Sequence, residues 1–443
     1  MTKMPLPSSH YFFFAIFLSY TLPPTLQVPL FAPISKDPST QLYTLSLYLK
    51  TPLQPTKLHL DLGSSFTWLL CDSTYTSSSY HHIPCNSSLC ASFHSTACSN
   101  CFHPRAPNCA NDTCALFPEN PLTRTTLLDN ALIDSLALPT SDGSTQGPLI
   151  LISDFIFSCS SSSLLQGLAT NAAGLAALGR SSNSLPAQIS AALSSSLCFA
   201  LCLPASTSSP GAAFFGSTGP YFTSSKIDLS KLLNYTSLIV NPVGDTVITH
   251  DAQPSDEYFI NLTSILINGH AVPINSSILT VDKNGFGGTK ISTAEPYTVL
   301  ETSVYKLFVE RFANASAAFN LTVTEAVEPF GVCYPAKDLT ETRVGPAVPT
   351  VDLVMQSEDV FWRIFGGNSM VRIEREGVDV WCLGFVDGGS RRRTPIVIGA
   401  YQMEDNLLQF DLHSNKLGFT SSLLLQAATC SDLNVANFYN HTK

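Results

Sequence analysis

The sequence predicts a mainly β protein of two similar lobes with a cleft between them, and three observations support this prediction. The chain of 443 residues is long enough for two lobes that each bury an apolar core. Only 13% of its residues are charged, and Ser, Thr and Pro are abundant, which favours short strands over helices. The two halves also repeat one order of segments: a strand, a special loop and a second strand, then a helix and an apolar strand that ends in glycine.

In the first half, short apolar runs at 42–49 and 58–60 are typical of strands. The loop 61–65, with the sequence Asp-Leu-Gly-Ser-Ser, follows directly, and residues 66–71 return to strand character. Asp61 is therefore expected on a rigid turn between two strands.

Helices are expected at two places. Residues 187–193 follow Pro186, which suits the first turn of a helix. Apolar residues recur at helical spacing between 303 and 312. Near the C-terminus, the sequence predicts a buried apolar strand that runs into glycine at 396–400. Two further strands are expected at 407–412 and 416–419, joined by the turn residues His-Ser-Asn.

The special loop of the second half differs from the first at the residue that decides the chemistry. It reads Ser292-Thr293-Ala294-Glu295, so serine stands where the first loop has Asp61. Water held between two facing carboxyl groups can hydrolyse a peptide bond, because the pair shares one proton. A serine hydroxyl neither ionises near neutral pH nor supplies a proton of the right acidity. We therefore expect no functional catalytic pair, with Asp61 and Ser292 as its vestiges.

Residues 1–27 have the features of a secretory signal peptide, with Lys3 near the start and an apolar run at 11–18 that is too short to span a bilayer. A buried N-terminal strand is the alternative. No later apolar run approaches membrane-spanning length, so we expect no membrane association of the mature form. We divide the remainder into an N-terminal β lobe, 28–235, and a C-terminal β lobe, 236–443.

The thirteen cysteines independently indicate an oxidising compartment, where disulfides form. Seven of them lie between Cys71 and Cys114, in an insert rich in Ser, Asn and Pro that could hardly order itself by hydrophobic burial. The odd total leaves one thiol free, and the spacing does not define the pairs. A zinc module is the alternative, but apart from Cys98 and Cys101 the cysteines form no paired C-x-x-C framework. We expect neither a metal nor a cofactor.

The net charge of −10 argues against nucleic acid or anionic surfaces as partners, because binding either requires clustered Lys and Arg. The basic cluster Arg391-Arg392-Arg393 follows two glycines and is interpreted as an exposed, solvated loop. Asn-x-Ser/Thr triplets in a secreted chain predict glycans on exposed loops. The acceptors are Asn86, Asn111, Asn234, Asn261, Asn275, Asn314, Asn320 and Asn440.

These segments resemble the pepsin-like aspartic proteases, and more narrowly their plant branch. Residues 60–68 look like the first catalytic loop, 179–180 with 184–186 like the start of the helix that follows, and 396–419 like the final strands. The resemblance covers nearly the whole mature chain. It implies a bilobal pepsin-like aspartic protease fold.

Finer matches are similar to the extracellular dermal glycoproteins, the basic globulins of legume seeds and the cereal xylanase inhibitors. They lie at 117–121, 289–300, 343–349 and 382–389. Members of that group are generally non-proteolytic, and several inhibit microbial glycosidases that attack plant walls. The resemblance thus implies a protein secreted to the apoplast or cell wall that inhibits a secreted microbial glycosidase of the xylanase or xyloglucanase type.

Two departures from the protease pattern agree with this inference. Ser292 and Ala294 replace Asp and Gly, which should alter both the carboxyl group and the tight turn. The expected flap, 125–135, contains no Tyr-Gly pair to close over a substrate.

One residue also departs from the inhibitor pattern, in which a His or Arg before the last cysteine reaches into the glycosidase active site. Counting back from Cys430 gives Gln426, a neutral amide without charge-assisted strength.

The first of three hypotheses is an inhibitor that contacts its target through the loop before Cys430. Its partner-binding residues would be Leu424, Leu425, Gln426 and Ala427, and the leucines at 423–425 could supply an exposed apolar anchor beside a disulfide. The alternative interpretation of these leucines is a strand packed on the core.

The second hypothesis is a working protease in which Glu295 or Asp282 assists Asp61. General acid–base help is commonly worth about 10²–10⁴ in rate, so a lone carboxylate should leave little activity. The third is a storage or ligand-binding glycoprotein without an enzyme target, in which Asp61 is a hydrogen-bonded acid in an inherited turn.

Overall fold

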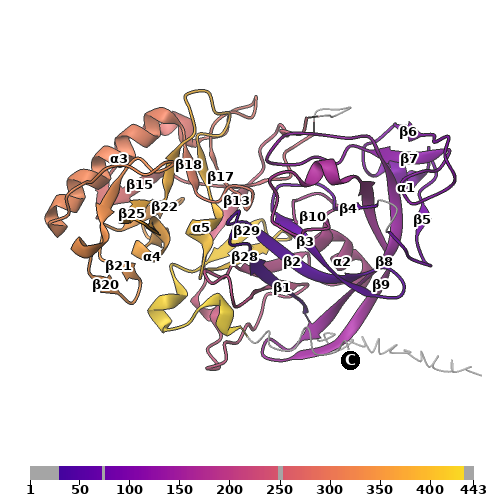
Figure 1. The fold of residues 1–443 in the computed structure, drawn as a ribbon, viewed down its shortest axis with the longest axis horizontal. Coiled ribbons are helices and arrows are strands. Elements are labelled where there is room, and N and C mark those ends of the chain that lie inside the picture. The colour runs from indigo at the N-terminus through magenta and orange to yellow at the C-terminus, as the bar shows by residue number, and fades with distance from the viewer. Residues whose placement is uncertain (1–28, 72–74, 248–252, 434–443) are drawn as a thin grey trace, which may run out of the picture.

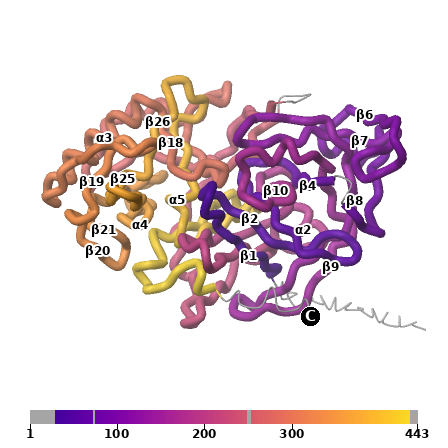
Figure 2. The backbone as a smooth tube through the Cα atoms, in the orientation of Figure 1, coloured from indigo at the N-terminus to yellow at the C-terminus, as the bar shows by residue number. Residues whose placement is uncertain are grey.

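The computed structural model describes residues 29–71, 75–247 and 253–433. Two lobes lie side by side, the first half of the chain in one and most of the second half in the other, while the last strands return to the region between them (Figures 1 and 2). The predicted mainly β, bilobal architecture is confirmed. The proposed signal peptide, 1–27, lies outside the described residues. Among those described, no helix has the length and apolarity needed to cross a membrane.

Most of the regular elements of the first half are strands. They are β1 (Leu30–Lys36), β2 (Tyr43–Leu49), β3 (Gln54–Asp61), β4 (Trp68–Leu70), β5 (His81–His82), β6 (Cys98–Ser99), β7 (Thr113–Leu116), β8 (Asp129–Ser141), β9 (Gln146–Ser160), β10 (Gly174–Ala177), β11 (Cys198–Cys202) and β12 (Gly211–Phe215). The α-helices here are α1 (Ser88–Ala91) and α2 (Leu185–Leu193), and Pro186 lies in the first turn of α2 as predicted.

The second half has shorter strands and one long helix. The strands are β13 (Asn234–Ile239), β14 (Tyr258–Ile260), β15 (Ser264–Ile267), β16 (His270–Ala271), β17 (Thr289–Ile291), β18 (Thr298–Leu300), β19 (Cys333–Pro335), β20 (Glu341–Thr342), β21 (Gly345–Pro346), β22 (Val351–Val354), β23 (Phe361–Ile364), β24 (Met370–Arg375), β25 (Val378–Leu383), β26 (Phe385–Asp387), β27 (Ile396–Ile398), β28 (Leu407–Asp411) and β29 (Lys416–Phe419). The helices are α3 (Thr302–Ser316), α4 (Gly366–Ser369) and α5 (Ala400–Met403).

The same strand arrangement surrounds both special loops. In the first lobe β10 pairs parallel with β3 and antiparallel with β4, and β4 pairs parallel with β9. In the second lobe β27 pairs parallel with β17 and antiparallel with β18, and β18 pairs parallel with β26. The repeated plan predicted from the sequence is therefore present in the strand pairing.

The two lobes share a continuous sheet. β28 pairs antiparallel with β11 of the first half, and β29 pairs with β13. Aromatic rings pack across this junction, with the centroid of Phe410 4.7 Å from that of Phe199 and 4.6 Å from that of Tyr258. The lobe boundary predicted at residue 235 falls inside β13. This shared core gives the lobes a fixed base, so the loops above it face each other in a defined geometry.

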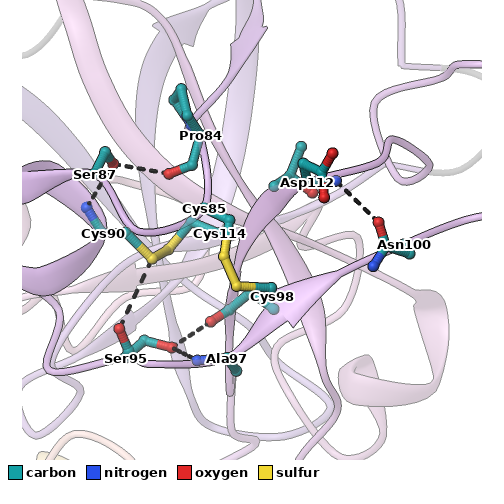
Figure 3. Close-up of a disulfide and its surroundings, with 12 residues drawn as sticks. Pro84, Cys85, Ser87, Cys90, Ser95, Ala97, Cys98, Asn100, Asp112 and Cys114 are labelled. Atoms are coloured by element: carbon teal, nitrogen blue, oxygen red, sulfur yellow. Dashed lines mark hydrogen bonds between the residues drawn. A yellow bond between two sulfur atoms is a disulfide. The ribbon is translucent and has the colours of Figure 1, made fainter.

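Disulfides order the cysteine-rich insert, as expected. Within it the bonds join Cys85 to Cys98, Cys90 to Cys114 and Cys101 to Cys109, while Cys71 pairs with Cys159 outside the insert. Figure 3 shows two of these bonds side by side, together with hydrogen bonds in which Oγ of Ser87 accepts the N–H of Cys90 and Oγ of Ser95 accepts the N–H of Ala97. The remaining pairs are Cys202–Cys430 and Cys333–Cys382, and Cys198 is the buried free thiol.

Candidate functional site

Asp61 ends β3 at the floor of the interlobe cleft, with only 3% of its surface exposed. The hydroxyl of Ser64 donates a hydrogen bond to Oδ2 of Asp61 at 2.5 Å, and the backbone N–H groups of Gly63 and Ser64 also donate to the carboxylate. Burial raises the pKa of Asp61, and these hydrogen bonds oppose the rise. Asp61 is thus a well-held acid, as an active site would require.

Ser292 takes the corresponding place after β17. Its Oγ accepts the N–H of Ala294 at 3.2 Å, just as the Asp61 carboxylate accepts the N–H of Gly63. Neither Gly63 nor Ala294 has a positive φ, so the backbone at 294 tolerates a side chain without strain. The expectation that the turn is altered was wrong. Serine preserves the hydrogen bond that shapes the turn but not the ionisable group.

Thr293 joins the two loops. Its Oγ1 accepts the N–H of Leu62 at 3.1 Å and donates to the carbonyl of Leu60 at 2.9 Å. Leu62, which occupies the matching position of the first loop, is fully buried and has no hydroxyl to return this contact. The connection between the lobes at the site is therefore one-sided, and it holds Asp61 and Ser292 in the same cleft.

The two acids suggested as helpers for Asp61 are engaged elsewhere. Glu295 lines the cleft but forms an ion pair with Arg392 at 3.3 Å. Asp282 accepts the backbone N–H groups of Asn284 and Phe286 within its own loop and does not line the cleft. Neither residue supplies the missing carboxyl group.

Glu257 is the acid whose charge acts on the pKa of Asp61, and the sequence did not point to it. A β-carbon placed on Gly63 would lie 3.6 Å from Oε1 of Glu257 and 3.8 Å from Oδ2 of Asp61. The charge of Glu257 helps to raise the pKa of Asp61. However, Nζ of Lys290 lies 2.5 Å from Oε1 of Glu257, so this carboxylate is held by a cation rather than by a proton shared with Asp61.

The segment that reaches over the cleft is not the expected one. Residues 125–135 run largely into β8 and none of them lines the cleft, so the predicted flap position was wrong. A turn at 119–126 takes that place, closed by a hydrogen bond from the N–H of Asn120 to the carbonyl of Thr125. We call it the cross-cleft turn.

The cross-cleft turn is fastened to the second lobe. Glu119 accepts the N–H of Val247 at 3.0 Å and pairs with Arg124 at 2.8 Å. Arg124 in turn contacts Asp245, and Nε1 of Trp68 donates to the carbonyl of Glu119 at 3.1 Å. These contacts span the cleft from one lobe to the other and narrow the approach to Asp61.

The predicted partner-binding loop forms a 3₁₀ turn, η6 (Leu423–Gln426), so the alternative of a core strand was wrong. Leu423 is buried and its N–H donates to the carbonyl of Asp405 at 2.8 Å. Leu424 is half-buried, Leu425 is 45% exposed, and Gln426 and Ala427 are exposed. The disulfide between Cys430 and Cys202 anchors the segment that follows.

The basic cluster is only partly solvated. Arg391 is exposed as predicted, but Arg392 pairs with Glu295, and Arg393 donates to the carbonyls of Val243, Gly244 and Gly285 at 2.8 to 3.0 Å. These two arginines therefore fasten loops of the second lobe beside the cleft. The interpretation of the whole cluster as a solvated loop was wrong.

The expected glycan acceptors are mostly accessible. Six have exposed side chains and Asn261 is half-buried; the exposed ones are Asn86, Asn111, Asn234, Asn275, Asn314 and Asn320. Asn440 lies outside the described residues. In the described ranges, no group of three His, Cys, Asp or Glu is placed to hold a metal ion.

The fold and the paired loops define a pepsin-like protein in which the first loop carries Asp61 and the second carries Ser292 in the corresponding place. Two family models match the chain, "Xylanase inhibitor N-terminal" over residues 43–217 and "Xylanase inhibitor C-terminal" over 257–421. The chain therefore belongs to this xylanase-inhibitor-like, aspartic-protease-like family.

Similar proteins carry different names. "Probable aspartic proteinase GIP1" of Glycine max is 71% identical over 99% of both chains, and "Basic 7S globulin" of Glycine max is 35% identical over 96% of both. Among solved structures, edgp is 45% identical with a TM-score of 0.89, covering 92% of this chain and 98% of that one. Conglutin gamma from lupine seeds is 35% identical with a TM-score of 0.79, covering 92% of this chain and 98% of that one.

Proposed function

We propose that this protein is a secreted, catalytically inactive glycoprotein that inhibits a microbial cell-wall-degrading glycosidase of the xylanase or xyloglucanase type. The observation that carries the proposal is that Ser292 occupies the place in the second loop that Asp61 occupies in the first. A serine in that position gives the turn its hydrogen bond but offers no second proton-sharing carboxyl group. Glu257 does not replace it, because Lys290 holds its carboxylate.

The fastened cross-cleft turn supports the loss of proteolysis. An extended peptide must enter between the lobes to reach Asp61, and the contacts of Glu119 and Arg124 with 245–247 lie across that path. Opening the path would break these contacts at the moment of binding. A protein with this arrangement is better suited to present a fixed surface than to admit a substrate.

The exposed η6 turn supports a partner-binding role. Binding loses less conformational entropy when the contacting loop is already rigid. Here the buried Leu423 and the Cys202–Cys430 disulfide fix the loop, while the apolar side chain of Leu425 remains available as an anchor. The neutral Gln426 can hydrogen-bond a carboxylate of the partner, although without the strength of a charged residue.

The test is titration of the purified full-length protein against a panel of microbial xylanases and xyloglucan-degrading endoglucanases. Leu425→Asp should weaken inhibition by about tenfold or more, the loss typical of a central apolar anchor. Leu149→Asp is the matched control, because Leu149 has the same 45% exposure but lies on β9 of the first lobe. Absence of inhibition at micromolar protein across the panel would defeat the proposal.

The alternative is a storage or ligand-binding glycoprotein without an enzyme target. The likeness to globulins and conglutins, one of them from lupine seeds, favours it. It predicts high abundance in seed and no inhibition of any glycosidase in the panel.

A further inference from the structure

A second cavity lies on the first lobe and shares no residue with the interlobe cleft. Its volume is about 440 Å³, and its apolar wall includes Leu49, Leu69 and Ala173. The strands β2 and β3 form one side. This size suits a small organic molecule rather than a polypeptide.

The cavity wall contains a hydroxyl with unused hydrogen-bonding capacity. Ser46 is 2% exposed, and its Oγ has no partner among the described residues. Ser46 lies opposite Lys57 in the pairing of β2 with β3. Buried polar groups of this kind need a hydrogen-bonding partner.

Two lysines give the cavity a positive mouth. Lys50 and Lys57 both line it, and Nζ of Lys50 lies 4.5 Å from the ring centroid of Tyr75, another lining residue. Within the ranges that the structure describes, neither lysine forms an ion pair. In a chain with a net charge of −10, two cations beside an apolar wall favour an anionic ligand.

We propose that this cavity binds a small hydroxylated carboxylic acid with an apolar body. The carboxylate would meet Lys50 and Lys57, the body would pack on Leu49 and Leu69, and the hydroxyl would bond Oγ of Ser46. This site is independent of the interlobe cleft and of the η6 turn.

The test uses the full-length protein and three matched probes, 4-hydroxybenzoate, benzoate and 4-hydroxybenzamide, with binding measured by ligand-observed NMR. The hydroxylated acid should bind most tightly. The double variant Lys50→Gln/Lys57→Gln should lose about tenfold in affinity for both acids and little for the amide. Ser46→Ala should abolish the preference for 4-hydroxybenzoate over benzoate while leaving benzoate binding unchanged.

The matched control is Lys283→Gln/Lys337→Gln, which removes two exposed lysines of the second lobe. It should bind all three probes as the unaltered protein does, and thermal unfolding of each variant checks that it is folded. Three results would overturn the proposal: no saturable binding of any probe in the millimolar range, equal binding of acid and amide, or equal losses in the cavity and control double variants.

Discussion

Replacing Thr293 with valine removes a hydroxyl that joins the two lobes at the site without changing the shape of the side chain. Its Oγ1 accepts from the N–H of Leu62 and donates to the carbonyl of Leu60, both in fully buried residues. Each buried backbone group left without its partner costs about 1–3 kcal/mol. Thr293→Val should therefore lower the free energy of unfolding by about 2–6 kcal/mol, since two such groups are affected.

The assay is urea unfolding followed by tryptophan fluorescence, which reports on both lobes because Trp68 lies in the first and Trp362 in the second. The chain provides a matched control in Thr289, which is also fully buried on β17 but whose hydroxyl has no partner among the described residues. Thr289→Val should be neutral or slightly stabilising. If both valine variants unfold at the same urea concentration as the unaltered protein, the link between the loops contributes nothing and the reasoning is refuted.

Three further outcomes are expected. Burial raises the pKa of Asp405 from 3.8 to about 6, so the stability that its neutral form contributes is present below pH 3.8 and is lost as the pH rises through 6. Asp405→Asn stays neutral and can still accept the N–H of Cys430, so urea unfolding should show its stability rising relative to that of the unaltered protein between pH 3.8 and 6. A stability difference that stays constant over this pH range would contradict the prediction. Glu119→Ala should change the free energy of unfolding by less than about 1 kcal/mol, because the ion pair of Glu119 with Arg124 is partly exposed. The variant should nevertheless speed hydrogen exchange at the amide of Val247, which loses its acceptor, and unchanged exchange would count against the fastened turn. Burial raises the pKa of Cys198 to about 12, so its thiol should resist alkylation until the protein unfolds, and rapid labelling of the folded protein would disprove its burial.

Much of the fold could be predicted because it depends on local patterns. Strand alternation located β2 and β3, helical spacing located α3, and Pro186 marked the start of α2. The repeated order of segments predicted two lobes. The disulfide pairs were not predictable, because cysteines far apart in sequence meet only after folding, as Cys202 and Cys430 do.

The site was predictable only where one residue carries the signal. The contrast between Asp61 and Ser292 is visible in the sequence, but Glu257 is not, because no motif surrounds it and the fold alone brings it beside Gly63. The cross-cleft turn was misplaced by a few residues, since the sequence around 119–135 lacks the Tyr-Gly pair that would have marked its tip. Ala294 suggested a changed turn, although the backbone there needs no positive φ.

The most direct test of an incomplete dyad is an assay of the purified protein for cleavage of denatured protein substrates from acid to neutral pH, with Asp61→Asn and pepstatin as controls. If Asp61 has no partner acid, the unaltered protein and the variant should show the same background, and pepstatin should change neither. Acid cleavage that disappears with pepstatin and with Asp61→Asn would show that another group, such as Glu257, completes the pair.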